Sequence, residues 1–218
     1  MRIGILGAGG MADALGTRWA AGAGHEVMVG GRDADKAAAL AERIGGGARA
    51  GSFEEAAEFG DAVLLALPYT AAREQAGVLR ETLRGRVLID CTNDLGPGFT
   101  LAGGGGPSAA EGIAAAASAG GAEARVVKAF NLCHEGVWRL TPPEFGGRAL
   151  AVPLCGDDES ALAVVRGLVK DLGCEPVSGG GLGRAGLLEA TAALLIGLWV
   201  GEGVDAQAIA PPLEFAAG

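Results

Sequence analysis

The sequence predicts an α/β fold, a doubly wound and mostly parallel sheet with a smaller C-terminal α/β module. Short apolar runs of strand length alternate with helical patterns along most of the chain, which is typical of β-α-β units with right-handed crossovers. The run at 62–67 is apolar throughout and ends at Pro68, as expected for a strand buried on both faces. A glycine-rich turn joins the first strand to the first helix.

The expected elements follow from these patterns in chain order. Strands are predicted at residues 2–6, 26–30, 49–50, 62–67, 86–90, 125–129, 150–155 and 175–177. Helices are predicted at residues 11–23, 34–44, 53–59, 71–83, 109–119, 158–172 and 185–200. Asp33 and Ser108 stand just before two of these helices and can cap them. The glycines at 179–181 predict a break between the last strand and the last helix.

Composition and charge limit the classes of function. Half of the 218 residues are apolar, which is enough for a sizeable core. The formal net charge of −9 argues against a broad surface for nucleic acid or an anionic membrane. The four cysteines are scattered without C-x-x-C or metal spacing, which favours buried thiols in a reducing compartment and predicts no metal. The N-terminus enters a strand at once, and the apolar stretch 187–200 is short for a bilayer and contains Glu189. We therefore expect a soluble cytoplasmic protein.

The turn after the first strand is the first candidate binding site. Its residues are Gly7, Ala8, Gly9, Gly10, Met11 and Ala12. Gly7 can make the tight turn, Gly9 lets the backbone approach phosphates, and Ala12 lets the helix pack close to the strand. The helix N-terminus offers N–H groups and partial positive charge to an anion. The sequence therefore predicts a Rossmann dinucleotide-binding domain at 1–145, with a smaller module at 146–218.

The end of the second strand indicates which dinucleotide binds. A carboxylate there would bind the ribose hydroxyls of NAD, whereas an arginine accommodates the 2′-phosphate of NADP. Here Gly31 and Arg32 follow the strand, and Lys36 lies one turn into the next helix. A guanidinium fork backed by an ammonium group suits a 2′-phosphate. We predict NADP(H), and the alternative is a solvated helix start.

Further candidates lie at the carboxyl ends of two other strands, beside the expected cofactor. They are Ala66, Leu67, Pro68, Ala129 and Asn131. Pro68 either shapes the cofactor wall or only ends its strand, and Asn131 either binds nicotinamide or substrate or satisfies loop backbone. His134 is the one candidate for a catalytic proton donor, with a structural role as the alternative. No other acid–base pair stands out, which suits hydride transfer between two bound cofactors.

These residues together resemble the NADPH-dependent F420 reductase family, also called F420H2:NADP oxidoreductases, over nearly the whole chain. The resemblance rests on the turn at 7–12, the Arg32…Lys36 element, Pro68 and the P-S-A-A-E stretch at 107–111. The most specific piece is V-P-L-C-G-D-D-E-S at 152–160, which is similar to the V-P-V-C-G-D-D stretch of the family. The resemblance implies hydride transfer between NADP(H) and the deazaflavin coenzyme F420, in a homodimer with the C-terminal helix in the interface.

The chain departs from the family pattern in two places. Gly31 replaces a serine of the 2′-phosphate element. Archaeal members carry a Ser/Asn-rich turn before the last helix, close to the deazaflavin, where this chain has G-G-G-L-G-R at 179–184. The residues that the resemblance leaves for substrate binding are Phe130, Gly180, Leu182 and Arg184. Arg184 either meets an anionic tail or takes part in a dimer contact.

Three hypotheses about function follow. The leading one is an NADPH-dependent oxidoreductase that exchanges a hydride with F420. The second keeps NADPH and changes the acceptor to a flavin, quinone, ferric chelate or imine, and the third is a non-catalytic NADP(H)-binding redox sensor. The apolar helix at 185–200 needs burial on most faces and also predicts a homodimer. The glycine-rich loop at 91–107 is either a mobile cover for the site or a solvent loop.

Overall fold

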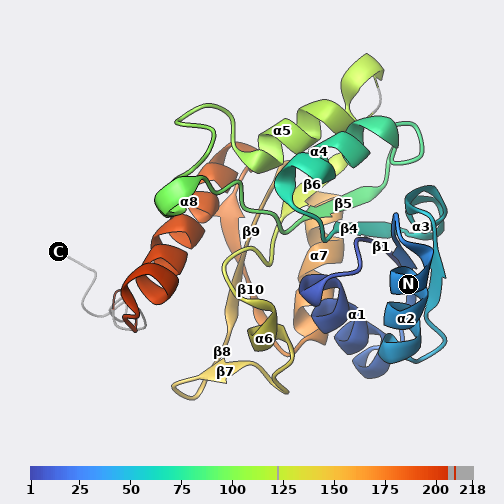
Figure 1. Cartoon of the computed structure of the whole chain (residues 1–218), viewed down its shortest axis with the longest axis horizontal. Helices are drawn as coiled ribbons and strands as arrows, with labels where there is room; N and C mark the ends of the chain where they lie inside the picture. The colour runs from blue at the N-terminus through green and yellow to red at the C-terminus, as the bar shows by residue number, and fades with distance from the viewer. Residues whose placement is uncertain (122, 206–208, 210–218) are drawn as a thin grey trace.

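Eight strands form one central sheet, in the order β10-β9-β6-β5-β4-β1-β2-β3 (Figure 1). The computed structural model describes residues 1–121, 123–205 and 209. The strands are β1 Arg2–Leu6, β2 Glu26–Gly30, β3 Arg49–Gly51, β4 Ala62–Leu65, β5 Val87–Asp90, β6 Arg125–Lys128, β9 Ala151–Gly156 and β10 Glu175–Gly180. A separate hairpin pairs β7 Glu144–Phe145 with β8 Arg148–Ala149.

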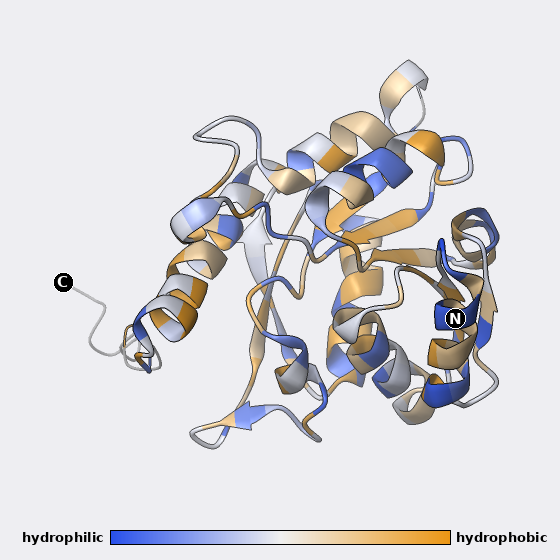
Figure 2. Ribbon diagram, viewed as in Figure 1, coloured by the Kyte–Doolittle hydropathy of each residue, from blue (hydrophilic) through white to orange (hydrophobic). Residues whose placement is uncertain are grey.

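The helices cover both faces of the sheet. They are α1 Gly10–Gly22, α2 Ala34–Ile44, α3 Phe53–Phe59, α4 Tyr69–Val78, α5 Ala109–Ala117, α6 Glu135–Trp138, α7 Glu159–Asp171 and α8 Ala185–Ile196. One apolar core lies between the sheet and α1, α2 and α7, and a second lies between the sheet and α3, α4 and α5. Figure 2 shows the apolar residues gathered in the strands and on the inner sides of these helices. The predicted α/β class with a doubly wound, mostly parallel sheet is confirmed.

The order of the strands creates the position of the site. All strand pairs from β3 to β6 are parallel, and the chain leaves β1 toward β2 and β3 before it returns to β4 on the other side of β1. The carboxyl ends of β1 and β4 therefore lie side by side with their onward connections diverging. Ligands of open α/β sheets bind at such a switch point.

The C-terminal strands reverse the direction of the sheet. β9 pairs antiparallel with β6, and β10 pairs parallel with β9. The two parts of the chain predicted at 1–145 and 146–218 therefore share one sheet, and their division into separate units stays a prediction. Residues 206–208 and 210–218 of the second part lie outside the described residues.

Local sequence signals explain where several helices begin. Asp33 accepts a hydrogen bond from the Lys36 N–H at 3.1 Å and so caps α2. Ser108 accepts one from the Glu111 N–H at 3.2 Å, and the Glu111 carboxylate bonds back to Ser108, which is a complete capping box. Both predicted N-caps are confirmed.

Strand β10 differs from its prediction, because it continues through the glycines that were expected to end it. Gly180 still pairs with Cys155 after a bulge. A Cβ on Gly179 would lie 2.7 Å from the Sγ of Cys155 and 3.0 Å from the oxygen of Leu154. The missing side chain therefore lets β10 approach β9 closely, which is a packing role that a turn prediction overlooks.

The last helical stretch is longer than predicted. Helical residues run without interruption from Leu182 to Glu202, with a final π-helical turn at Gly197–Glu202, and the most apolar window has a mean hydropathy of 1.4. By length and composition alone this stretch of 21 residues reaches the size of a membrane span, whereas the apolar segment at 187–200 is only part of it. A single stretch of this kind is weak support for a span, and Glu189 in its middle is buried against the sheet.

Candidate functional site

Backbone hydrogen bonds hold the glycine-rich turn in place between β1, β2 and the end of β4. The Gly7 N–H donates to the Gly30 oxygen at 2.8 Å, and the Ala66 N–H donates to the Leu6 oxygen at 2.9 Å. Gly7 has φ +125°, and a Cβ on it would lie 2.1 Å from the Ala66 oxygen. Only glycine fits this position, because any side chain would collide with the backbone that follows β4.

The N-terminus of α1 opens beside this turn. Gly9 is its N-cap in an extended conformation, and within the described chain no side chain caps it. A Cβ on Gly9 would meet nothing within 4 Å. Ala12 is fully buried, and a Cβ on Gly16 would lie 2.8 Å from a methyl group of Ile44. The helix therefore packs close to the sheet, with open space beside Gly9 and the Glu135 side chain against Gly10. A helix N-terminus of this kind suits a phosphate.

Two cations lie beyond the end of the neighbouring strand β2. Arg32 and Lys36 are both exposed. Lys36 Nζ lies 3.7 Å from the Asp33 carboxylate, with the lysine side chain 77% exposed. The Gly31 N–H donates to the Gly51 oxygen at 3.2 Å, which fixes the start of this connection. The structure thus brings the predicted phosphate turn and the predicted 2′-phosphate cations to the same edge.

An asparagine pair joins the ends of β5 and β6. The Asn131 Nδ2 donates to the Asn93 Oδ1 at 3.0 Å, and the Asn93 Nδ2 donates to the Asn131 backbone oxygen at 2.8 Å. Asn131 is 5% exposed. Asn93 was not among the predicted site residues, although its place just after a strand of the same parallel set is a signal that the sequence contains. The pair keeps the two loops after β5 and β6 at a fixed spacing.

The side chains of Phe130 and Ala129 lie in the core. Phe130 has φ +63° and is 2% exposed. Its ring makes edge contacts with Trp19 at 5.8 Å and with Trp138 at 5.4 Å between centroids. Ala129 is fully buried and its N–H donates to the Asp90 oxygen. The left-handed backbone turns the Phe130 ring toward α1 and α6, so the structure does not present this ring to a substrate.

His134 caps the short helix α6. Its Nδ1 accepts a hydrogen bond from the Gly136 N–H at 3.2 Å, and its Nε2 lies 3.1 Å from Glu135. The side chain is 78% exposed. These contacts agree with the structural alternative, and a role for His134 as proton donor stays a prediction.

The residues expected near the substrate after β10 lie away from this edge. β9 and β10 run antiparallel to β6, so their carboxyl ends point toward the opposite edge of the sheet. Leu182 lines a hollow of about 370 Å³ together with Arg125, the first residue of β6. Gly180 has φ +97° and lies against the Arg184 side chain, whose Nε donates to the Gly179 oxygen at 2.8 Å. The structure does not bring Gly180, Leu182 and Arg184 together with the phosphate turn.

A buried ionic cluster supports the site and was missed by the sequence analysis. Lys128 Nζ donates to Asp90 at 2.9 Å, to Glu189 at 2.8 Å and to the Thr92 backbone oxygen at 2.6 Å. Both side-chain oxygens of Glu189 also accept N–H groups at the start of α5, from Ala109 at 2.9 Å and from Ala110 at 3.2 Å. The sequence does contain a signal of this cluster. Asp90 and Lys128 are charged residues at the ends of apolar strands, and Glu189 is a charged residue inside an apolar helix.

The two carboxylates stabilise the buried ammonium group of Lys128. Lys128 has no exposed side-chain surface. Its burial acts to lower the pKa of its ammonium group, but the carboxylates of Asp90 and Glu189 outweigh this and raise that pKa above its ordinary value. Two carboxylates face one ammonium group, and the N-terminus of α5 offsets the remaining negative charge. The cluster therefore ties β5, β6, α5 and α8 together directly below the Asn93–Asn131 pair.

Cysteine chemistry is disfavoured here. The four cysteines are free thiols, and Cys155 and Cys174 are buried. Burial raises the pKa of Cys91 to about 12, and that of Cys133 to about 11. A thiol with such a pKa holds almost no thiolate near neutral pH and is a poor nucleophile. In the part of the chain that the structure describes, no group of three or more His, Cys, Asp or Glu side chains could hold a metal ion.

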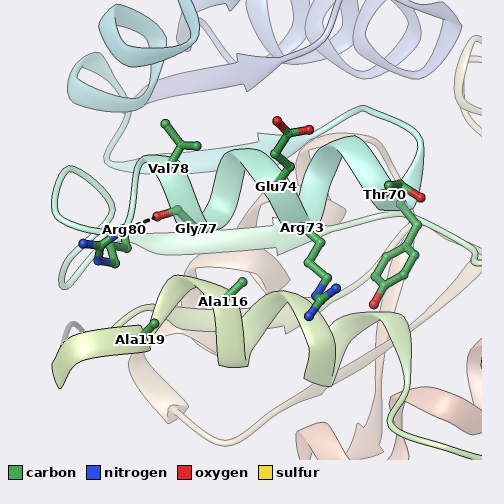
Figure 3. Close-up of a pocket in the computed structure, with 9 residues that line it drawn as sticks. Thr70, Arg73, Glu74, Gly77, Val78, Arg80, Ala116 and Ala119 are labelled. Carbon is green, nitrogen blue, oxygen red and sulfur yellow. Dashed lines mark hydrogen bonds between the residues drawn. The ribbon is translucent and has the colours of Figure 1, made fainter.

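The remaining hollows differ in character. An apolar hollow of about 590 Å³ begins at Leu132, directly after Asn131, and is closed by α8 residues such as Leu194 and Leu195. A groove of about 630 Å³ runs between α4 and α5, where Arg73 points toward α5 (Figure 3). The Tyr69 hydroxyl lies against Gly112 of α5. None of the predicted cofactor or substrate residues lines this groove.

The loop at 91–107 is anchored, because Phe99 packs near Gly197 of the last helical stretch.

Comparison with known proteins gives consistent results. Residues 2–94 match the family described as NADP oxidoreductase, coenzyme F420-dependent. The F420-dependent NADP reductase of Methanocaldococcus jannaschii is 28% identical over 218 residues, which cover 91% of this chain and 92% of that protein. The enzyme of the same name from Methanothermobacter marburgensis is 36% identical over 100 residues, 42% of this chain and less than half, 44%, of that protein. The crystal structure of a putative F420-dependent NADP-reductase from Arthrobacter sp. FB24 has a TM-score of 0.77 at 26% identity and covers 93% of this chain and 95% of its own.

Proposed function

We propose that this chain, whose residues 2–94 match the coenzyme F420-dependent NADP oxidoreductase family, transfers a hydride between NADP(H) and the deazaflavin coenzyme F420. The observation that carries the proposal is the N-terminus of α1, which has no side-chain cap in the described chain and is open at Gly9, at the same edge of the sheet as two exposed cations. Gly9 borders open space, and Arg32 and Lys36 follow the neighbouring strand. The helix start suits a pyrophosphate and the two cations suit a 2′-phosphate, and they follow the neighbouring parallel strands β1 and β2.

In the proposed binding mode, the residues at the carboxyl ends of the parallel strands each bind a different part of the dinucleotide. The backbone of residues 7–12 and the start of α1 bind the pyrophosphate, and Arg32 and Lys36 bind the 2′-phosphate, with Gly31 leaving room for it. The end of β4, at Ala66, Leu67 and Pro68, forms the wall beside the dinucleotide. Asn131, held by Asn93, and the neighbouring Ala129 backbone border the nicotinamide ring.

NADPH supplies the hydride from its nicotinamide ring when bound, so the chain needs mainly to orient two rings and to exclude water. The apolar hollow that begins at Leu132 is the surface on which we place the acceptor ring, because it adjoins Asn131 and contains few polar groups. This assignment replaces Gly180, Leu182 and Arg184, since those residues lie on or after β10, the edge strand that is separated from β1 by β9, β6, β5 and β4. The Asn93–Asn131 pair then sets the distance between the rings.

We also propose a cytoplasmic homodimer without nucleic-acid or membrane partners. The apolar residues Leu187 and Val200 are exposed along the last helical stretch and do not line the apolar hollow. A second copy would cover such a face, as isologous dimers of apolar helices do. The net charge of −9 supports the absence of a nucleic-acid partner.

Replacing Arg32 by alanine tests the choice of cofactor. Loss of a charge-assisted bidentate contact is expected to weaken NADPH binding roughly 10- to 100-fold, with NADH binding unchanged, because only NADPH carries the 2′-phosphate. The measurement is the dissociation constant of each cofactor by fluorescence titration. Arg148→Ala, which removes an exposed arginine of β8, is the control and should change neither constant. Equal weakening of NADPH and NADH would contradict the assignment of Arg32.

A further inference from the structure

The proposed pyrophosphate turn already has an anion of the chain beside it. Glu135 is the first residue of α6, and its side chain lies against Gly10, the first residue of α1. A Cβ on Gly10 would lie 2.5 Å from Glu135 Oε1, 2.7 Å from its Cδ and 2.9 Å from its Cγ. The carboxylate therefore occupies the space that a side chain at position 10 would fill.

The position of Glu135 is fixed by its own element. Trp138, in the same helix, is buried, and its ring makes an edge contact with Phe130 at 5.4 Å between centroids. The helices α6 and α1 are packed together. Because the backbone of α6 is anchored in the core, only the side chain of Glu135 is able to move away from the turn.

His134 orients the carboxylate. Because its Nδ1 accepts the Gly136 N–H, the proton of the neutral ring lies on Nε2, which is 3.1 Å from the Oε2 of Glu135. This contact holds the carboxylate in place beside Gly10. The free protein thus holds one negative charge at the start of α1, where the helix dipole stabilises it.

A dinucleotide brings further negative charge to the same place. The pyrophosphate would approach the first N–H groups of α1, so its oxygens and the Glu135 carboxylate would compete for one positive helix end. Like charges at short range repel, and the carboxylate has to rotate toward solvent before the pyrophosphate can settle.

We propose that Glu135 is an autoinhibitory contact, a carboxylate of the chain that covers the pyrophosphate turn in the free protein and is displaced by NADP(H). The inference rests on the proposed function, because it needs the turn to bind a dinucleotide. It assigns Glu135 a role in setting cofactor affinity. Removing the Glu135 charge is therefore expected to strengthen cofactor binding, whereas removing a group that binds the cofactor would weaken it.

The test is Glu135→Gln, which keeps the size of the side chain and removes its charge. NADP⁺ is expected to bind about two- to tenfold more tightly to the variant, the size of one helix-terminus charge interaction. The melting temperature of the cofactor-free variant is expected to fall, because α1 loses its stabilising anion. Glu58→Gln, at an exposed carboxylate of α3, is the matched control and should leave the affinity unchanged.

Each outcome is informative. Weaker binding by Glu135→Gln would overturn the proposal and make Glu135 an acceptor for the cofactor, and unchanged affinity would overturn it as well. If the wild-type protein does not bind NADP⁺ in the same titration, the proposed function fails first. The two failures are therefore distinguishable.

Discussion

Replacing Lys128 by methionine is expected to lower the free energy of unfolding by about 3–5 kcal/mol, the usual cost of removing one partner from a buried ion pair. Methionine fills a similar volume but leaves Asp90 and Glu189 without their shared cation. Both carboxylates are buried, and Glu189 also holds the N-terminus of α5. The measurement is urea denaturation followed by circular dichroism.

Two further variants make this prediction specific. Lys170→Met, which removes an exposed lysine from the last turn of α7, should change stability by less than about 0.5 kcal/mol. Adding Glu189→Gln to Lys128→Met should recover part of the lost stability, because one of the two unpaired charges is then removed. If Lys128→Met and Lys170→Met are equally stable, the cluster does not support the fold.

The second large effect is expected from Gly7→Ala. Alanine would have to adopt φ +125° and place its Cβ 2.1 Å from the Ala66 oxygen. The strain and the collision together should cost more than about 3 kcal/mol and separate the end of β1 from the end of β4. Because this turn is the proposed pyrophosphate site, we also expect NADP(H) binding to fall by at least roughly 100-fold.

Gly24→Ala separates the collision from the backbone strain. Gly24 also has a positive φ, +65°, but a Cβ on it meets nothing within 4 Å. This control should lose about 1 kcal/mol through its left-handed backbone and keep its cofactor affinity. Thermal unfolding and cofactor titration of both variants check the prediction. Equal behaviour of the two alanine variants would show that the close approach at Gly7 has no special role.

The parts of the fold that sequence could predict are those with local signals. β2 at Glu26–Gly30 and α2 at Ala34–Ile44 have the predicted bounds, because a glycine-rich stretch ends each preceding element and Asp33 caps the helix. The meeting of the glycine-rich turn and Arg32 at one edge of the sheet was also predictable. In a parallel sheet, residues that follow strands meet at one edge, so the turn at 7–12 and Arg32 were expected to lie near each other.

The parts that sequence could not predict depend on contacts between distant elements. Strand direction decided the place of Leu182, since the antiparallel pairing of β9 with β6 carries it to the other edge of the sheet. The partnership of Lys128 with Glu189 joins residues that are 61 positions apart. The contact of Glu135 with Gly10 exists because aromatic packing anchors α6 against α1. No periodicity or motif in a single chain encodes such pairings.

The most direct test of the central claim is an anaerobic spectrophotometric assay of the purified protein with NADPH and oxidised coenzyme F420. Parallel reactions contain NADH in place of NADPH, or a flavin in place of F420. We expect the visible absorption band of F420 to disappear with NADPH and to persist with NADH, because the 2′-phosphate cations select the cofactor. Persistence of the F420 band in a reaction in which NADPH demonstrably binds would contradict the account and would leave a flavin or another acceptor as the partner of the site.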